Sequence, residues 1–459
     1  MRRVATLFAV GLMMALFHRV TADGPLEARA TLALGFLVLT ALVGGEFARQ
    51  ARLPRITGYL VLGFAVGPAW LGLVRRDELD ALRFFGDAAV TVLALAAGAE
   101  LDLSALRRGR LALGRLATGA IAFPFVAVTL VALTVSRWFP ITVHHRFGDG
   151  VAVALVLGTL AAASSPVITM AVMGERDARG PVARTLLGVT ILQVGAVALL
   201  FALVLALSKP WTSAGALNRA IAGEALVAFV GSVALGAALG FALGAYLPRM
   251  PRYPVPVLVA VALGTAEVAG LLRFEALLIA LTAGFWLENF ARPAAQPLRL
   301  ELKRALVPAS VVLFALAGAG LKLKALAELW PWVLLLAGLR VMSLRAGFWW
   351  AGRHPSVPPA LAQEGWLTLV SQAGFALGLA QLARRAFPEW GVSLEALIVA
   401  MIGVHEVAGP ICAQRALALA EAVREETHDA QGGAGAGPGV SGGGGTNAAG
   451  VVAARESSA

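Results

Sequence analysis

The amino-acid sequence predicts an all-α membrane protein with about thirteen or fourteen membrane-crossing helices. Hydrophobic residues make up 59% of its 459 residues, charged residues only 14%, and the mean hydropathy is +0.79. A soluble protein needs about 25% charged residues to cover its surface. Here the charges gather in short clusters between long apolar segments, which is typical of a helical bundle in a lipid bilayer.

About fourteen apolar segments are candidates for these helices. They are residues 4–17, 30–45, 56–74, 84–101, 111–135, 150–173, 185–207, 225–247, 255–272, 274–288, 306–321, 330–350, 364–382 and 394–414. Several are shorter than the roughly 20 residues of an upright span. Short or Gly/Pro-interrupted spans are common in transporters, whose helices break near the middle of the membrane.

The positive charges predict the orientation in the membrane. The net charge is +11, and Lys and Arg are denser in every second loop, including the loops at Arg49, Arg107 and Arg176. Cytoplasmic loops are enriched in Lys and Arg, so we expect these loops and the C-terminus on the cytoplasmic side of a bacterial inner membrane. The basic residues form no stripe with interleaved aromatics, so nucleic acid is not an expected partner.

The chain divides into five parts. Residues 1–29 are a signal-like or anchor segment, which we interpret as an uncleaved anchor. We expect a first repeat of six helices at 30–207, a linker helix at 208–254 and a second repeat of six helices at 255–414. Residues 415–459 are expected to form a Gly-rich disordered cytoplasmic tail. A single linker helix turns the second repeat over relative to the first, which predicts an inverted repeat.

The fifth span of each repeat is interrupted by small and polar residues. One interruption reads Ala-Ala-Ala-Ser-Ser-Pro at 161–166, and the other reads Ser-Gln-Ala-Gly at 371–374. A proline kink would explain the first alone, but the matching positions favour two crossing broken helices, whose half-helix ends carry partial charges. Such a break must be buried in protein or line a cavity. We expect an ion-binding region formed by Ser164, Ser165, Pro166, Ser371, Gln372 and Gly374.

Several motifs occur in a characteristic order. They read LPRITGYL at 53–60, GP at 67–68, LGL at 71–73, AGAELD at 97–102, SSP at 164–166, RTLLG at 184–188, SQAGFALGLA at 371–380, FP at 387–388 and EVAGP at 406–410. From about residue 35 to 414 the chain resembles the monovalent cation:proton antiporter superfamily, in its Kef-like and Nap-like branch of sodium/hydrogen exchanger membrane domains. The resemblance implies an elevator-like exchanger of monovalent cations and protons, with a core domain that carries the crossing and a domain that forms a homodimer.

The resemblance also implies one or two aspartates on the helix after the first broken helix. The matching positions hold Gln193 and Val194, and residues 185–207 contain no Asp or Glu. Neither side chain titrates, so neither can release a proton when a cation arrives. We therefore expect a secondary transporter of the Na⁺ or K⁺:proton antiporter type with altered or lost coupling, and we include both residues in the ion-binding region.

Two charged residues lie deep in predicted spans. Arg340 matches a buried basic position of the family and is expected to point toward the crossing, as a dipole neutraliser, a functional group or both. Glu267 is expected to be buried, mainly in a structural role, and is the one deep substitute for the missing acids. We interpret His405 as a packed histidine and Glu406 as a residue near a span end.

Two other functions remain open. Arg340 without the usual acids leaves the crossing positive, which favours an anion or organic-acid transporter on the same fold. A non-transporting sensory or scaffold protein is the second alternative. The sequence contains no HExxH, paired Cys/His, P-loop or GxSxG motif, and its only cysteine is Cys412. We therefore expect no enzymatic activity, no cofactor and no metal site.

Overall fold

The protein is an all-α, multi-pass membrane protein, as predicted. The computed structural model describes residues 13, 14, 16, 24–51, 53–178, 180–208, 212, 219–249, 254–321 and 323–433. Within these residues the chain forms helices and no strand, and nine helical segments are long and apolar enough to cross a membrane. The predicted anchor at 4–17 falls almost entirely outside the described residues.

The helices of the first half follow the predicted spans, with shorter helices between them. They are α2 (Leu26–Gln50), α3 (Arg55–Val66), α4 (Arg76–Ala81), α5 (Arg83–Ala99), α6 (Leu103–Arg108), α7 (Arg110–Thr134), α8 (Phe147–Ala161), α9 (Pro166–Arg176) and α10 (Pro181–Ser208). α3 is shorter than the predicted 56–74, because Gly67 and Pro68 follow its last residue and proline does not continue a helix.

The linker and the second half repeat this order. They are α11 (Arg219–Tyr246), η2 (Leu247–Arg249), α12 (Pro254–Leu272), α13 (Ala276–Phe290), α14 (Arg292–Ala319), α15 (Leu323–Gly352), α16 (Pro359–Glu364), η3 (Gly365–Leu369), α17 (Gly374–Ala386) and α18 (Gly391–Gly433). The fifth span of each half is broken, into α8 and α9 in one and into α16, η3 and α17 in the other. The inverted repeat with two broken helices is thereby confirmed.

The prediction of a disordered tail from residue 415 is wrong for its first part. α18 continues to Gly433, because the residues that follow Gln414 are rich in Ala, Leu, Glu and Arg, which favour a helix. The part of α18 from Glu421 to Gly433 belongs to a different unit from the chain before it. Residues 434–459, which hold most of the glycines of the predicted tail, lie outside the described part of the chain.

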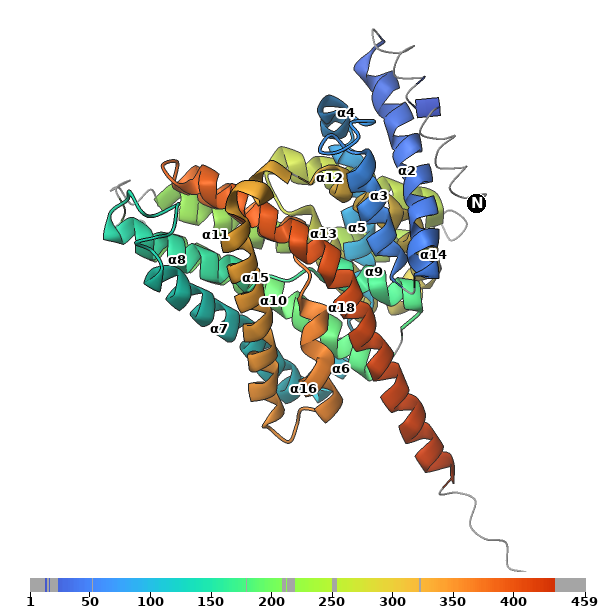
Figure 1. Ribbon diagram of the computed structural model, residues 1–459. Coiled ribbons are helices and arrows are strands. Elements are labelled where there is room, and N and C mark those ends of the chain that lie inside the picture. Colours follow the sequence, from blue (N-terminus) through green and yellow to red (C-terminus); the bar gives the residue numbers. More distant parts are fainter. Residues whose placement is uncertain are drawn as a thin grey trace, which may run out of the picture. The chain divides into compact units, whose positions relative to one another are not determined.

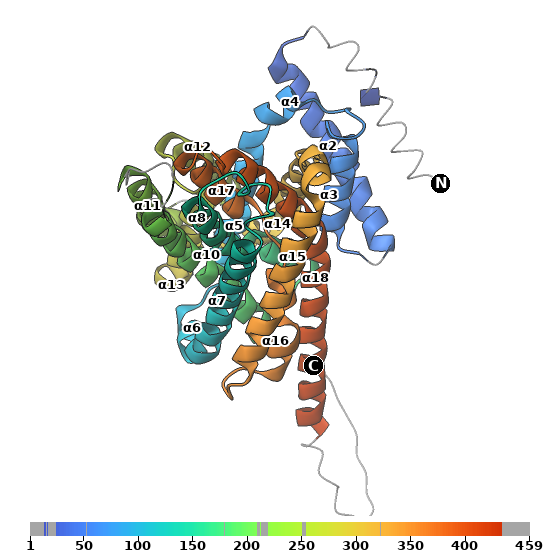
Figure 2. The same cartoon turned by 60° about the vertical axis from the view of Figure 1, so that its left-hand side comes forward.

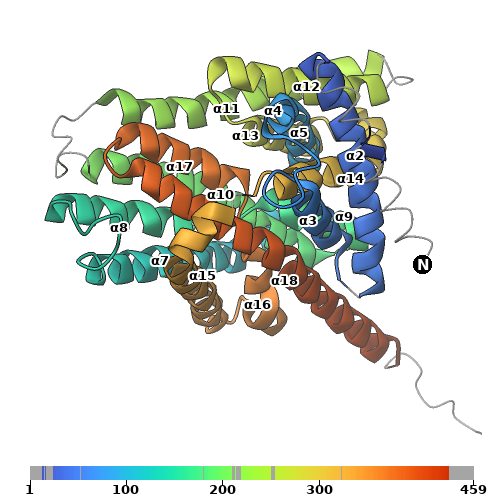
Figure 3. The same ribbon diagram turned by 45° about the horizontal axis from the view of Figure 1, so that its top comes forward.

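The helices pack in two groups. We call α7–α10 and α15–α17 the crossing bundle, because it holds both breaks; its α7 lies between α8 and α15 (Figures 1 and 2). We call α2, α3, α5 and α11–α14 the second bundle, in which α3 packs on α2 and α14, and α13 packs on α5 and α11 (Figure 3). The bundles meet where α9 contacts α5 and α14 and where α10 contacts α11.

Glycines let the helices approach closely. A Cβ added to Gly347 of α15 would lie 2.2 Å from the carbonyl oxygen of Gly119 on α7, and one added to Gly119 would lie 2.4 Å from the carbonyl oxygen of Gly347. Lipid tails are as apolar as leucine, so helices in a bilayer associate through such close packing and not through the hydrophobic effect. The α7–α15 contact therefore requires both glycines.

We predict that Gly347→Ala destabilises the protein, because the added methyl group must push α7 and α15 apart, at a cost of about 1–3 kcal/mol. The measurement is the apparent thermal unfolding midpoint in detergent. Gly338→Ala on the same helix is the matched control, since a Cβ there meets no atom within 4 Å. Equal midpoints for the two variants would show that α7 and α15 are not in close contact.

Candidate ion-binding site

The first break lies between α8 and α9. α8 ends at Ala161, and α9 begins with Pro166, a position where the missing N–H of proline leaves no hydrogen bond unmade. Ser165 caps α9: its Oγ accepts a hydrogen bond from the Ile168 N–H at 3.3 Å. The residues that predicted a break therefore also start the second half-helix.

The second break is longer and has a different form. The short helix α16 continues as the 3₁₀ helix η3, which ends at Leu369, and the chain is irregular until α17 begins at Gly374. Ser371 and Gln372 lie in this irregular segment, and both are buried. Because these residues are not helical, their backbone groups need partners from other segments.

The two breaks contact each other. The Ser165 N–H donates to the Ser371 carbonyl at 3.1 Å, and the Ser164 hydroxyl donates to the Leu369 carbonyl at 2.8 Å. In return, Nε2 of Gln372 donates to the Leu160 carbonyl at 2.8 Å. The predicted approach of the two breaks is confirmed, whereas their role in ion binding stays a prediction.

Arg340 points into this contact, as predicted, and is fully buried. Toward the first break, its Nε donates to the Ala161 carbonyl at 2.8 Å and its Nη2 donates to the Ala163 carbonyl at 2.7 Å. Toward the second break, its Nη1 donates to the Val370 carbonyl at 2.7 Å and its Nη2 donates to the Leu369 carbonyl at 2.8 Å. These carbonyls end α8 and η3, where the helix dipoles are negative. The guanidinium therefore compensates both helix ends at once.

Gln193 lies at the same place. Its side chain is fully buried, and Nε2 donates to the carbonyls of Ala162 in the first break, at 2.6 Å, and Ala120 on α7, at 3.1 Å. Its Oε1 is buried and has no hydrogen-bond partner among the described residues. Val194 is also fully buried. At the position where the resemblance implies an acid, an amide side chain therefore contacts the crossing.

α18 adds a histidine that the sequence reasoning did not assign to the site. Nδ1 of His405 lies 2.9 Å from Oε1 of Gln372, and the imidazole is buried. One turn later, a Cβ on Gly409 would lie 2.5 Å from that of Ser371, so α18 passes directly over the second break.

The burial of two carboxylates differs from what the sequence predicted. Glu406 is buried, only 7% exposed, and does not extend to the membrane surface. Glu267, expected to be buried, is exposed: the buried face of α12 carries Ala262, Thr265, Ala266 and Ala269, and the helix turns Glu267 away from it. The prediction of Glu267 as a deep acid is therefore wrong.

Glu275 is a further carboxylate that the sequence reasoning did not single out. It immediately precedes α13, and its N–H donates to the Ser232 hydroxyl on α11 at 2.9 Å. One of its carboxylate oxygens lies 2.8 Å from where a Cβ of Gly378 would stand, so the side chain reaches α17 of the crossing bundle.

Comparisons with known proteins agree with this architecture. The family described as "Sodium/hydrogen exchanger, transmembrane" matches residues 36–413. A structure of the sodium proton antiporter MjNhaP1 from Methanocaldococcus jannaschii at pH 8 is similar over 86% of this chain and 99% of that chain, with a TM-score of 0.63 and 15% identity. An electron-microscopy map of the same antiporter gives a TM-score of 0.57 and 16% identity, over 87% and 96% of the two chains.

A curated relative matches a smaller part of the chain. The iron transporter MagA of Paramagnetospirillum magneticum is 28% identical over 160 residues, which are 34% of this chain and 33% of that protein. The chain therefore matches about a third of the length of this relative. The structural likenesses, at 15% and 16% identity, show the fold.

We predict that Arg340→Ala strongly destabilises the protein, because several buried carbonyls at the ends of α8 and η3 lose their donors, at about 1–3 kcal/mol each. The measurement is again the apparent unfolding midpoint in detergent. Arg345→Ala is the matched control, since Arg345 lies on the same helix and is exposed. An Arg340→Ala protein as stable as this control would contradict the proposed compensation of the helix ends.

Proposed function

This chain belongs to the sodium/hydrogen exchanger family, and we propose that it is a secondary transporter that exchanges Na⁺ or K⁺ for protons with altered coupling. We further propose that it acts as a homodimer in a bacterial inner membrane, with its C-terminus in the cytoplasm. Family membership, the antiporter fold and the contact between the two breaks support the exchange of cations and protons.

The single observation that carries the altered coupling is the amide of Gln193 at the crossing. Its Nε2 donates to the Ala162 carbonyl, while its buried Oε1 lacks a partner among the described residues. An amide oxygen can ligate Na⁺ or K⁺, but an amide has no proton to exchange within the physiological pH range. Cation binding and proton release therefore cannot compete at this position.

A coupled exchange then needs a carboxylate on another helix, and we propose Glu406. It is buried on α18 and directly follows His405, whose Nδ1 lies 2.9 Å from Gln372 at the crossing. A carboxylate inside a membrane bundle can hold either a proton or a cation, which is what exchange requires. Glu267 no longer qualifies, because its side chain is exposed.

The anion transporter alternative loses its main support. It depends on the charge of Arg340 being available to an anionic substrate. Each nitrogen of this guanidinium donates to main-chain carbonyls instead, at 2.7–2.8 Å. Its charge is directed at the helix ends, so we favour a cation as the transported ion.

We predict that Glu406→Gln abolishes whatever cation-driven proton movement the native protein shows, because the proposed proton carrier is removed. The measurement is proton flux in proteoliposomes under imposed Na⁺ and K⁺ gradients, with and without a pH gradient. Glu267→Gln is the matched control and should equal the native protein. If exchange persists in Glu406→Gln, another residue carries the proton. No flux of any ion in native protein that is correctly inserted would favour the sensory or scaffold alternative.

We also predict that Val194→Asp creates or strengthens proton-coupled exchange, because it restores a titratable group next to Gln193. The same proteoliposome assay measures it, with Val194→Asn as the control of similar size and no charge. Faster exchange in the aspartate variant alone is the expected result. Equal fluxes in the two folded variants would show that position 194 does not reach the ion pathway.

A further inference from the structure

Two arginine side chains lie over two consecutive tryptophans at one end of α15. The guanidinium carbon of Arg115, on α7, is 4.5 Å from the centre of the Trp350 ring, and that of Arg353 is 3.8 Å from the centre of the Trp349 ring. The attraction between a cation and an aromatic face holds such pairs together. We propose that these two pairs form a binding site for the phosphate group of an anionic phospholipid.

Neither guanidinium has an acid to pair with. Residues 103–148 and 329–363, which include α7 and most of α15, contain no Asp or Glu. Within the described residues Arg115 and Arg353 form no ion pair, and Nε of Arg115 is buried without a hydrogen-bond partner. Buried N–H groups in proteins are almost always paired, so these donors need an acceptor from outside the chain.

The fold holds Trp350 in a fixed position. Its ring also contacts that of Phe123 on α7, with centroids 6.0 Å apart and an angle of 43° between the planes. About one turn from Arg115 and Trp350, Gly119 and Gly347 bring α7 and α15 into the close contact described above. The arginine and the tryptophan therefore belong to a contact that already fixes both helices, which reduces the entropy lost when a ligand binds.

The pairs lie at the depth of lipid headgroups. Arg115 is five residues after the start of α7 at Arg110, or about 8 Å along the helix axis, and Trp350 is two residues before the end of α15. Arginine side chains extend from this depth to the membrane surface, where tryptophan rings also gather. The proposed orientation places these helix ends in the cytoplasmic leaflet, whose surface carries anionic lipids.

The donors and their surroundings select the ligand. A guanidinium presents a planar fork of N–H groups that matches two phosphate oxygens. Two guanidinium groups favour a headgroup with a net negative charge, because they repel the ammonium of a zwitterionic headgroup. On α15, Met342 and Trp349 are 72% and 60% exposed and offer the acyl chains of a lipid a contact that free phosphate does not use.

The site lies on the two helices that hold the crossing. α7 carries Ala120, whose carbonyl accepts a hydrogen bond from Gln193, and α15 carries Arg340, ten residues before Trp350. Ten helical residues span about 15 Å. A lipid bound at this end of α7 and α15 would therefore stabilise the crossing bundle without contacting its breaks.

The test is native mass spectrometry of delipidated protein in detergent, titrated with phosphatidylglycerol, which is anionic, or with phosphatidylcholine, which has no net charge. We expect one phosphatidylglycerol per chain to bind about tenfold more tightly than phosphatidylcholine, and Arg115→Gln to lose this preference. Arg137→Gln is the matched control, since it removes the same charge from an exposed arginine beyond the opposite end of α7, and it should bind like the native protein.

Two further variants separate this site from a general attraction of positive charge. Arg115→Lys keeps the charge but replaces the planar fork by a point charge, so it should also bind phosphatidylglycerol more weakly than the native protein. Arg353→Gln changes an exposed side chain and should weaken binding as well, so it tests the site even where the Arg115 variants do not fold.

Glycerol 3-phosphate and inorganic phosphate distinguish a lipid from a soluble ligand, because they carry the phosphate group without acyl chains. We expect neither to displace phosphatidylglycerol at the concentration where this lipid saturates the site. Displacement there would overturn the lipid as the ligand. Equal binding of the two lipids to native protein, or equal losses in Arg115→Gln and Arg137→Gln, would overturn the site. Native affinity in folded Arg353→Gln or in Arg115→Lys would overturn it as well.

Discussion

The structure depends on how unpaired main-chain carbonyls are satisfied inside a membrane. Breaking two helices leaves carbonyls at the ends of α8 and η3 without partners in the next turn, and a bilayer offers no water to replace them. Side chains provide the donors instead: Arg340 serves both ends, Gln193 the first break, and Gln372 reaches across from the second. The crossing can exist only because these donors come from α10, from α15 and from the second break itself.

This constraint also explains which parts of the site the sequence revealed. Both breaks and the direction of Arg340 could be predicted because their signals are local: Pro166 cannot continue the hydrogen-bond ladder, and a charge in an apolar span cannot face lipid. The Gln193 and Val194 positions were located by resemblance to a family with acids there. Both residues are buried beside the first break because α10, which carries them, follows the first broken helix in the order of helices that the resemblance implies.

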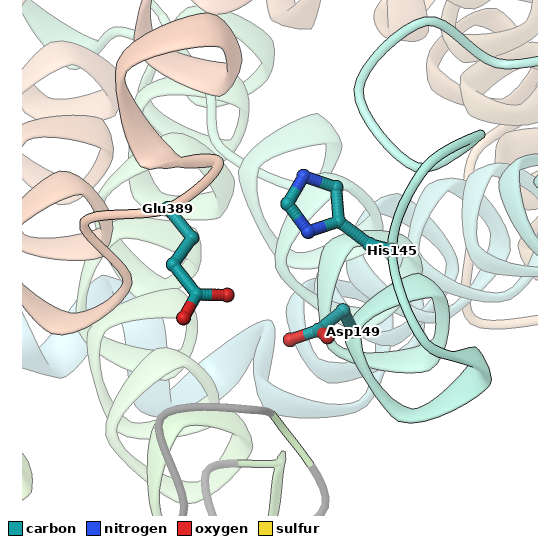
Figure 4. Close-up of side chains that lie close together, drawn as sticks. All are labelled: His145, Asp149 and Glu389. Carbon is teal, nitrogen blue, oxygen red and sulfur yellow. The ribbon is translucent and has the colours of Figure 1, made fainter.

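The remaining features depend on distances that no local pattern contains. Glu267 and Glu406 both occupy apolar spans, but one faces outward and the other inward, and only the rotation of each helix against its neighbours decides this. His405 required knowing that α18 passes over the second break. His145, Asp149 and Glu389 likewise come together where the start of α8 and the segment before it meet the connection between α17 and α18 (Figure 4).

The link between the breaks has a consequence for biogenesis. The carbonyls of Ala161 and Ala163 emerge from the ribosome 179 and 177 residues before Arg340, and Gln372 comes later still. A chain that stops before α15 has Gln193 but lacks Arg340 and Gln372, so the carbonyls of its first broken helix are only partly satisfied in lipid. We therefore expect the first break to stay in contact with water until the second half is inserted. Premature termination would leave a membrane fragment marked for degradation by its own unpaired backbone.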